Sequence, residues 1–151
     1  MPNQLKKNLF NQCQLFVKSR VLNAQQELHA AQEAAENEES SSAGDKYNTD
    51  RAMIQIEIEK YEKQLIEAQK LQKALKLINI ERSYDYVDLG SLVETNIGTY
   101  FFSIGIGKIV IDQAIIYAIS PASPLGQHLL GKKTGDQILF NNKTITILKI
   151  S

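Results

Sequence analysis

The chain has 151 residues, of which 43% are hydrophobic and 23% charged, and its 17 basic residues balance its 17 acidic ones. This is the composition of one globular domain or two small ones, and the zero net charge excludes an overall positive field that would attract nucleic acid or anionic lipid. Cys13 is the only cysteine, which excludes an internal disulfide framework. Residues 1–12 lack the apolar core of a signal peptide, and no window approaches the ~18 uninterrupted apolar residues of a membrane span. We therefore expect a cytoplasmic protein whose partner is a protein surface.

The residues up to about position 80 have the composition of helices. Gly44 is their only glycine and no proline follows Pro2, while Gln, Glu, Lys, Ala and Leu are frequent. Apolar residues recur every seven positions, as in the seam of a coiled coil. The rows are Phe10, Val17, Ala24 and Ala31 with Val21, Leu28 and Ala35 on the first segment, and Ile54, Tyr61, Ala68 and Leu75 with Ile58 and Leu65 on the second. Each segment is expected to form a helix that buries this stripe against a partner helix.

A polar segment, NEESSSAGDKYNTD at residues 37–50, separates the two helical segments. Its small and polar residues around Gly44 predict a loop, with Asn48 or Thr49 as the N-cap of the second helix. Folding back at this loop gives an antiparallel helical hairpin over residues 1–80, with its tip at 37–47 and arms of roughly 45 Å at 1.5 Å per residue.

After residue 80 the pattern changes from heptads to short strand-like runs. The runs are YVDLGSLVET, GTYFFSIGIG, KIVI, AIIYAIS, QILF and TITILKI, and they predict a small antiparallel sheet over residues 81–151. TNIGT and FNNKT are expected to form hairpin turns. Ser123 as N-cap, Pro124 at the first helical position and Gly131 just past the end predict one short helix. The chain is therefore predicted to be α+β.

The stretch GQHLLGKK, residues 126–133, nearly matches the phosphate-binding pattern G-x-x-x-x-G-K-[ST]. Gly126, Gly131 and Lys132 fit the pattern. Position 133 is Lys, however, so the hydroxyl that would reach Mg²⁺ is missing, and the SPASP turn upstream stands where a buried strand should lead into the loop. A nucleotide site is not expected here.

Residues 118–136, AISPASPLGQHLLGKKTGD, resemble the carboxy-terminal signature of the GreA/GreB family of transcript-cleavage factors, S-P-x-x-P-[IL]-G-x-x-[LI]-[LI]-G-[KR]-x-x-G-D. The stretch VDLGSLVET is similar to the strand that opens the globular domain of that family, and the helical hairpin before it is similar to the family's other half. The positions in register are Ser120, Pro124, Leu125, Gly126, Leu129, Leu130, Gly131, Lys132, Gly135 and Asp136. The strong motif is confined to this stretch, while the resemblance in architecture spans the chain.

The resemblance implies an FKBP-like carboxy-terminal domain that docks beside the secondary channel of bacterial RNA polymerase, and a hairpin that reaches down the channel. Such a factor is not itself an enzyme; it stimulates the polymerase's own nuclease activity and contacts transcript RNA only indirectly. Prolyl isomerase activity is not expected, because fold does not imply activity. For Lys132 and Lys133, an ordinary solvated surface is the alternative to polymerase contact. The residues that the resemblance assigns to polymerase binding are Pro124, Leu125, Gly126, Lys132, Lys133 and Asp136.

The hairpin tip of the family carries a D-x-x-E-N-A-E-Y pattern, whose first two acids help to hold the second Mg²⁺ of the polymerase active centre, so the factor needs no cofactor of its own. When Tyr47 is aligned with the family tyrosine without a gap, Ser40 and Ala43 occupy the two acidic positions, and the motif is not preserved. A gap of one or two residues would bring Glu39 and Asp45 near the metal, and these are our candidate catalytic, metal-positioning residues. The alternative is that they are ordinary loop and helix-cap acids.

Three functions are consistent with this sequence. The first is a Gre-like elongation factor that promotes cleavage of backtracked transcripts through an acidic tip. The second keeps the docking but makes the hairpin a non-cleaving inhibitor or competitor in the channel. The third is a coiled-coil adaptor without polymerase contact, which the heptads allow and the signature disfavours. An Ala-rich seam broken by Gln14 and Gln72 also leaves room for weak self-association through the hairpin faces.

Overall fold

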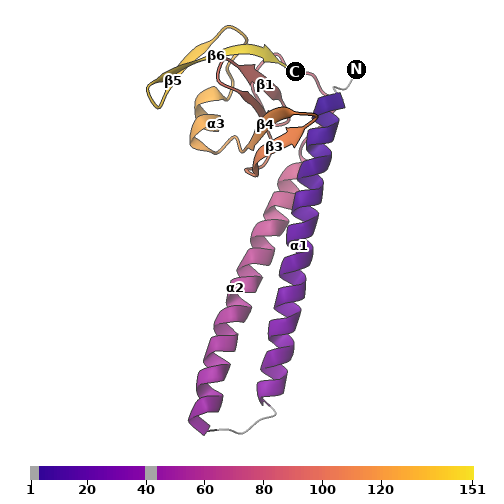
Figure 1. Cartoon of the computed structure of the whole chain (residues 1–151), viewed down its shortest axis with the longest axis vertical. Coiled ribbons are helices and arrows are strands. Elements are labelled where there is room, and N and C mark those ends of the chain that lie inside the picture. The colour runs from indigo at the N-terminus through magenta and orange to yellow at the C-terminus, as the bar shows by residue number, and fades with distance from the viewer. Residues whose placement is uncertain (1–3, 40–43) are drawn as a thin grey trace. The chain divides into compact units, whose positions relative to one another are not determined.

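The computed structural model describes the chain over residues 4–39 and 44–151, with side chains described for 4–37 and 50–151. Over these residues the protein is α+β: a pair of long helices precedes a mixed sheet with one short helix (Figure 1). The helices are α1 (Gln4–Glu39), α2 (Gly44–Lys76) and α3 (Pro124–Leu129). The strands are β1 (Leu92–Thr95), β2 (Thr99–Phe102), β3 (Gly107–Ile111), β4 (Ala114–Ile119), β5 (Gln137–Phe140) and β6 (Lys143–Ile150).

The chain divides into two compact units. One consists of residues 16–72 and is called the helical unit here; the other combines the described part of residues 1–15 with residues 73–151 and is called the sheet unit. The first turns of α1 and the last residues of α2 therefore belong to the same unit as the sheet.

Within the helical unit, α1 and α2 run side by side in opposite directions (Figure 1). The predicted seam is confirmed: Val17, Ala24, Ala31 and Ala68 are buried, and the other seam positions of this unit are at least partly buried. The connection between the helices is shorter than the predicted loop at 37–50, because α1 continues to Glu39 and α2 starts at Gly44. This corrects the expected N-cap: positions 48 and 49 lie inside α2. Helix propagation past the last seam residues, through Glu and Lys positions that favour helices, accounts for the difference.

The sheet has the strand order β3-β4-β2-β1-β6-β5. The prediction of a wholly antiparallel sheet is wrong in one pairing, because β2 and β4 are parallel, with Tyr100 aligned to Tyr117. The chain leaves β2, forms β3 at the sheet edge and returns through a two-residue turn, so that β4 is inserted beside β2. Residue patterns do not determine which of the two strands, β3 or β4, becomes the neighbour of β2.

The predicted hairpin turns are confirmed. Asn141 and Asn142, with φ of 51° and 63°, connect β5 to β6, and both adopt the left-handed conformation that asparagine tolerates better than most residues. In the β1–β2 turn the Thr95 hydroxyl donates to the carbonyl oxygen of Gly98 at 2.7 Å. These turns fix the register of the strands that they join.

Helix α3 covers one face of the sheet through Leu129, which is completely buried, and Leu125, which is partly buried. Residues 4–15 of α1 contribute Leu9 and Cys13, both at 0% exposure, to the same unit. Burial of these apolar side chains stabilises the sheet unit. The core cluster around α3 consists of Val87, Val93, Tyr100, Phe102, Leu129, Ile145 and Ile147.

Candidate functional site

The signature segment begins with a capped helix. Ser123 has extended backbone angles, and its Oγ accepts a hydrogen bond from the N–H of Gly126 at 3.1 Å while donating to the carbonyl oxygen of Ser120 at 2.7 Å. Pro124 occupies the first helical position, where the missing N–H costs nothing. Gly131 follows the helix with φ of 81°. The helix boundaries predicted from Ser123, Pro124 and Gly131 are confirmed.

Gly126 is buried where the SPASP turn folds over the start of α3. A Cβ added here would meet the carbonyl oxygen of Ser120 and would lie 2.8 Å from Ser123 Oγ and 3.0 Å from the carbonyl oxygen of Pro121. Two of these neighbours are backbone atoms, which cannot move aside as a flexible side chain can. Only glycine fits this position, so Gly126 determines the shape of the turn.

The residues after α3 are joined to the rest of the sheet unit by backbone hydrogen bonds. The N–H of Gly131 donates to the carbonyl oxygen of Val87 at 2.8 Å, and the N–H of Val87 donates to the carbonyl oxygen of Lys132 at 2.8 Å. The Asp136 carboxylate accepts from the N–H of Lys133 at 2.8 Å, which closes the tight turn that contains Gly135. The segment 131–136 therefore has a defined backbone, on which Lys132 and Lys133 are held.

The six predicted polymerase-binding residues differ in what they offer to a partner. The side chains of Pro124, Lys132 and Lys133 are exposed. Leu125 packs partly on the core and Gly126 is buried, so these two support the shape of the surface. Asp136 is exposed, but its carboxylate already accepts the hydrogen bond from the Lys133 N–H within its own turn. The assignment of these residues to polymerase binding stays a prediction.

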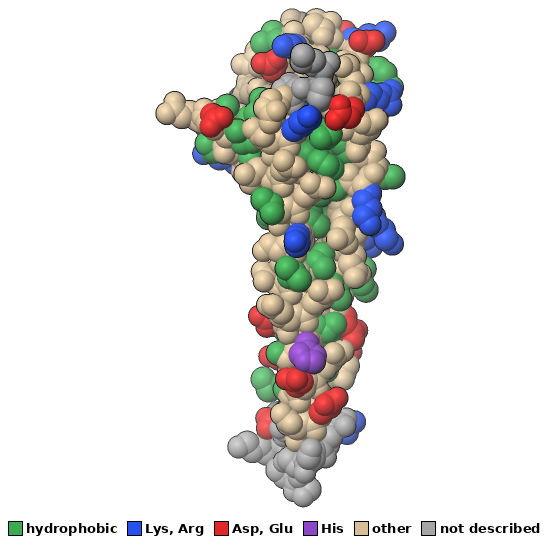
Figure 2. Space-filling model, turned by 90° about the vertical axis from the view of Figure 1, so that its right-hand side faces the viewer, with side chains coloured by type: hydrophobic (Ala, Val, Ile, Leu, Met, Phe, Trp, Pro, Cys, Tyr) green, Lys and Arg blue, Asp and Glu red, His purple; other side chains and the backbone are tan. Residues whose placement is uncertain are grey.

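The two tip candidates have different positions in the backbone. Glu39 is the last residue of α1, and Asp45 is the second residue of α2; their side chains lie outside the described residues. On the described part of α1, the basic residues Lys18 and Arg20 precede acidic residues at 27, 33 and 36. Figure 2 shows this gathering of acidic side chains toward the connection between the helices. Whether Glu39 and Asp45 approach a common point stays a prediction.

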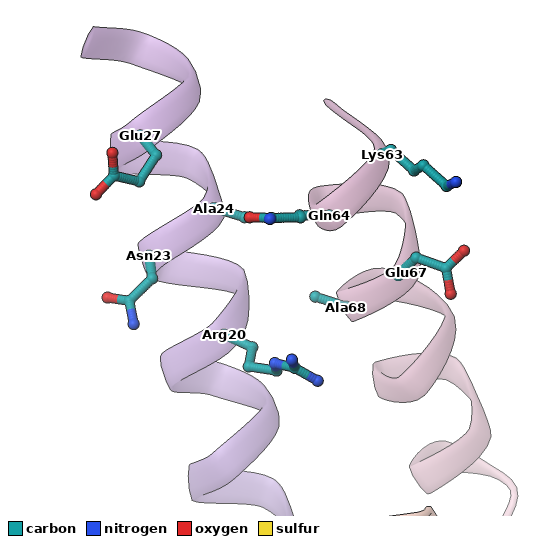
Figure 3. Close-up of a pocket in the computed structure, with 8 residues that line it drawn as sticks. All are labelled: Arg20, Asn23, Ala24, Glu27, Lys63, Gln64, Glu67 and Ala68. Carbon is teal, nitrogen blue, oxygen red and sulfur yellow. The ribbon is translucent and has the colours of Figure 1, made fainter. Parts of the chain in front are cut away.

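An open groove of about 540 Å³ lies between α1 and α2 in the helical unit, and six of the eight residues that line it are exposed. The side chain of Gln64 on α2 extends toward Ala24 of α1, and Ala68 lies one turn further along α2 (Figure 3). Ala24 and Ala68 are the two buried residues of this lining. The heptad pattern locates the seam correctly, but it does not show that two alanines and a glutamine meet there.

Lys6 is a buried residue that the sequence analysis missed. Only 2% of it is exposed, and its ammonium donates to the backbone oxygens of Arg82 and Ser151, each at 3.1 Å. The same nitrogen lies 4.7 Å from the centre of the Tyr84 ring, and the Arg82 guanidinium carbon lies 4.8 Å from that centre. Burial lowers the pKa of Lys6 from its usual 10.5 to about 8. Its spacing of four residues from Phe10 was the available signal, because it places Lys6 on the buried stripe of α1.

The cysteine and the histidines have structural surroundings. Cys13 is buried with its Sγ 3.7 Å from Ser103 Oγ, and burial raises the pKa of its thiol despite this hydrogen bond, which disfavours the reactive thiolate. His29 pairs with Glu33 at 3.0 Å on the surface, while His128 Nδ1 lies 2.8 Å from the carbonyl oxygen of Pro124. Among the residues that the structure describes, no group of three or more His, Cys, Asp or Glu could hold a metal ion.

Over the stretches 4–39 and 44–151, no helix combines the length and the apolar character that crossing a membrane requires. A scan against protein-family models finds no match, and a search of curated proteins finds no similar sequence. The resemblance to transcript-cleavage factors consequently rests on residues 118–136 and on the order of the helical and sheet segments.

Proposed function

We propose that this protein is a Gre-like transcription elongation factor of the cytoplasm that binds bacterial RNA polymerase at its secondary channel and promotes cleavage of backtracked transcripts. The observation that carries the proposal is the signature at residues 118–136, found in a chain whose first half is a helical pair. An FKBP-like identity of the sheet unit is part of the proposal. The segment has a local physical logic in this chain, because Ser123 caps α3, Pro124 starts it, and Gly131 and Gly135 adopt the positive φ of the turns that follow.

The docking step is proposed to use the exposed side chains that this segment holds in place. Pro124 offers a rigid apolar contact, and Lys132 and Lys133 offer two adjacent positive charges. A protein surface that carries acidic side chains opposite these lysines would be recognised by charge complementarity. Because the backbone on either side is fixed by hydrogen bonds, little conformational entropy would be lost on binding.

The cleavage step is proposed to use Glu39 and Asp45 at the connection between α1 and α2. The polymerase would supply the Mg²⁺ and the catalytic centre, and the carboxylates would help to hold a metal ion that keeps several of its waters. The factor would thus be an accessory protein without an activity of its own. The acidic residues that gather on the same end of α1, among them Glu33 and Glu36, would favour the approach of this end to a cation-rich site.

One observation favours a second candidate function. An ungapped alignment on Tyr47 places Ser40 and Ala43 where the family has its two acids. A hydroxyl and a methyl group cannot replace a carboxylate pair as Mg²⁺ ligands. The second candidate is therefore a factor that docks in the same way and occupies the channel without stimulating cleavage.

A stalled, backtracked elongation complex of the cognate polymerase tests the proposal. We expect the wild-type protein to accelerate shortening of the labelled transcript, and Asp45→Ala or Glu39→Ala to remove most of that acceleration while binding to the polymerase is retained. Glu62→Ala is the matched control, because Glu62 is an exposed acid of α2 far from the connection between the helices. Binding without acceleration by the wild-type protein would establish the second candidate instead.

Docking is tested separately by a pull-down of purified polymerase. The double variant Lys132→Glu/Lys133→Glu is expected to weaken binding, whereas Lys143→Glu, at an exposed position of β6, is expected to leave it unchanged. Failure of the wild-type protein to bind the polymerase would refute both candidate functions.

A further inference from the structure

The sheet has two outer strands, β3 and β5, and β3 has only one of the usual protections of an edge, the single charge of Lys108. Residues 108–111 read KIVI, without proline, and β3 pairs with β4 in an unbroken register from Gly107 to Ile111. Natural proteins block such edges with prolines, bulges or charged side chains such as lysine, because a free edge can pair with another strand. β3 has one lysine and neither a proline nor a bulge.

The hairpin geometry determines which backbone groups of β3 face outward. The turn between β3 and β4 has two residues, Asp112 and Gln113, with φ of 49° and 70°. A hydrogen-bonded pair flanks such a turn, and hydrogen-bonded and non-hydrogen-bonded pairs then alternate along the ladder. Lys108 and Val110 therefore direct their N–H and C=O groups away from β4, toward the open edge.

The side chains beside this edge form an exposed apolar strip. Val110 is 58% exposed, and its cross-strand partner on β4, Ile115, is 48% exposed. Tyr117, which is aligned with Lys108, is 38% exposed on the same face. Such a strip next to unpaired backbone groups favours an added strand, because both the ladder and the apolar face would be extended.

The charges at the two ends of the edge indicate the kind of strand that fits. Lys108 lies at the start of β3 and Asp112 directly after its end. When two identical strands pair in antiparallel orientation, the lysine of each copy approaches the aspartate of the other. The zero net charge of the chain adds no long-range repulsion between two copies.

We propose that β3 pairs with β3 of a second copy of this chain and joins the two sheets into one. In this antiparallel register Ile109 lies on the twofold axis, Lys108 of each copy lies opposite Val110 of the other, and the free backbone groups of both residues are paired. Lys108 is then a diagonal neighbour of Asp112 in the second copy, within reach of its long side chain. The inference is independent of polymerase binding.

The other edge does not have this self-complementarity. Leu139 of β5 is as open as Val110, at 67% exposure. The acid next to β5, however, is Asp136, whose carboxylate is held by the N–H of Lys133, and the opposite end of β5 leads into two asparagines. β5 therefore provides a matched control site on the same sheet.

Sedimentation velocity over a concentration series tests the proposal with four proteins. The wild-type chain is expected to form a dimer. Val110→Lys places lysines opposite lysines at two symmetric positions, and we expect it to raise the dimer dissociation constant about tenfold or more. Val110→Glu places a carboxylate opposite Lys108 at both positions, and we expect dimerisation to be retained or strengthened. Leu139→Lys is expected to behave like the wild type.

A wild-type protein that stays monomeric at the highest concentration would overturn the proposal. Loss of the dimer in both Val110→Glu and Val110→Lys would also overturn it, because in this register a carboxylate at position 110 attracts Lys108 of the second copy and a lysine there repels it. An effect of Leu139→Lys equal to that of Val110→Lys would likewise refute it. Because Val110 and Leu139 are both mostly exposed, all variants should unfold at the wild-type temperature, which thermal denaturation would check.

Discussion

The sheet unit buries large side chains completely and ties its loops to one another with hydrogen bonds, whereas the helical unit is joined along a narrow seam. Phe101, Phe102 and Leu129 are all at 0% exposure in the sheet unit. In the helical unit the fully buried seam positions hold Val17 and alanines, and the larger seam residues stay partly exposed. The difference implies that a substitution at a buried position lowers the free energy of unfolding more in the sheet unit than in the helical unit.

The largest effect is expected at Phe102, the aromatic centre of the core around α3. Phe102→Ala should lower the free energy of unfolding by about 3–5 kcal/mol, because it removes a buried ring and leaves a cavity. Leu28→Ala in the seam should cost clearly less, since Leu28 is only partly buried. Urea denaturation followed by far-ultraviolet circular dichroism measures both. Equal losses for the two variants would contradict the comparison between the units.

A somewhat smaller effect is expected at Gly126. Gly126→Ala should cost about 1–3 kcal/mol, because the new methyl group would be forced against the carbonyl oxygens of Ser120 and Pro121. Gly105→Ala is the matched control, since a Cβ at Gly105 has no neighbour within 4 Å, and it should leave the urea midpoint nearly unchanged. A Gly126→Ala variant with the urea midpoint of the wild type would show that the turn can rearrange to accommodate the methyl group.

This second prediction also affects how the function is tested. A substitution at Gly126 that abolished polymerase binding would report on the shape of the turn and on folding. A substitution at Lys132 or Lys133 changes exposed side chains, and it therefore reports on contact. The two kinds of position in the signature should be analysed separately.

A pH-dependent effect is expected from Lys6, the buried cation of the sheet unit. Its pKa is about 8 in the folded protein and 10.5 in the unfolded chain, so between these values the unfolded state binds more protons. Stability due to this group should therefore rise with pH, by about 1 kcal/mol between pH 8 and 9. Lys6→Met should remove the rise, which urea midpoints at pH 7, 8, 9 and 9.5 would measure relative to the wild type.

The control for this effect is Lys18→Met, which changes an exposed lysine on the same helix. It should preserve the wild-type pH profile. Cys13, Tyr84 and Tyr100 have pKa values raised by burial. Such groups lower stability as the pH rises through their unfolded values, 9.0 for the thiol and 10.0 for the tyrosines, so the effect of Lys6 is measured as the difference between Lys6→Met and the wild type at each pH. A Lys6→Met variant that keeps the wild-type rise would show that another group is responsible.

Local features of the fold were predictable because they depend on neighbouring residues. The seam follows from the seven-residue spacing of positions such as Val17 and Ala24, and α3 follows from Ser123, Pro124 and Gly131. The parallel pairing of β2 with β4 was not predictable, because the choice between β3 and β4 as the neighbour of β2 depends on packing across the whole sheet. Lys6 was missed for a related reason: the two backbone oxygens that accept its hydrogen bonds belong to Arg82 and Ser151, far away in the sequence.

The candidate site was predictable to the same extent. The backbone of the signature segment follows its residue types, so the cap at Ser123 and the glycine turns were correctly anticipated. The hydrogen bond from the Lys133 N–H to the Asp136 carboxylate, which closes this turn, required the structure. The role of Glu39 and Asp45 stays a prediction because their side chains lie outside the described residues.

The smallest effect, and the only stabilising one, is expected at the groove beside the helical seam. Ala24 borders this groove of about 540 Å³, and Gln64 extends toward it from α2 (Figure 3), so the groove has room for the larger apolar side chain of Ala24→Leu. Filling such a space should raise the free energy of unfolding by about 0.5–1 kcal/mol. Gln25→Leu is the control, because Gln25 is exposed on the next position of α1 and its replacement adds no seam contact. Thermal and urea unfolding of both variants measure the difference. Destabilisation by Ala24→Leu would mean that the seam is tightly packed after all and that the helical unit is as intolerant of change as the sheet unit.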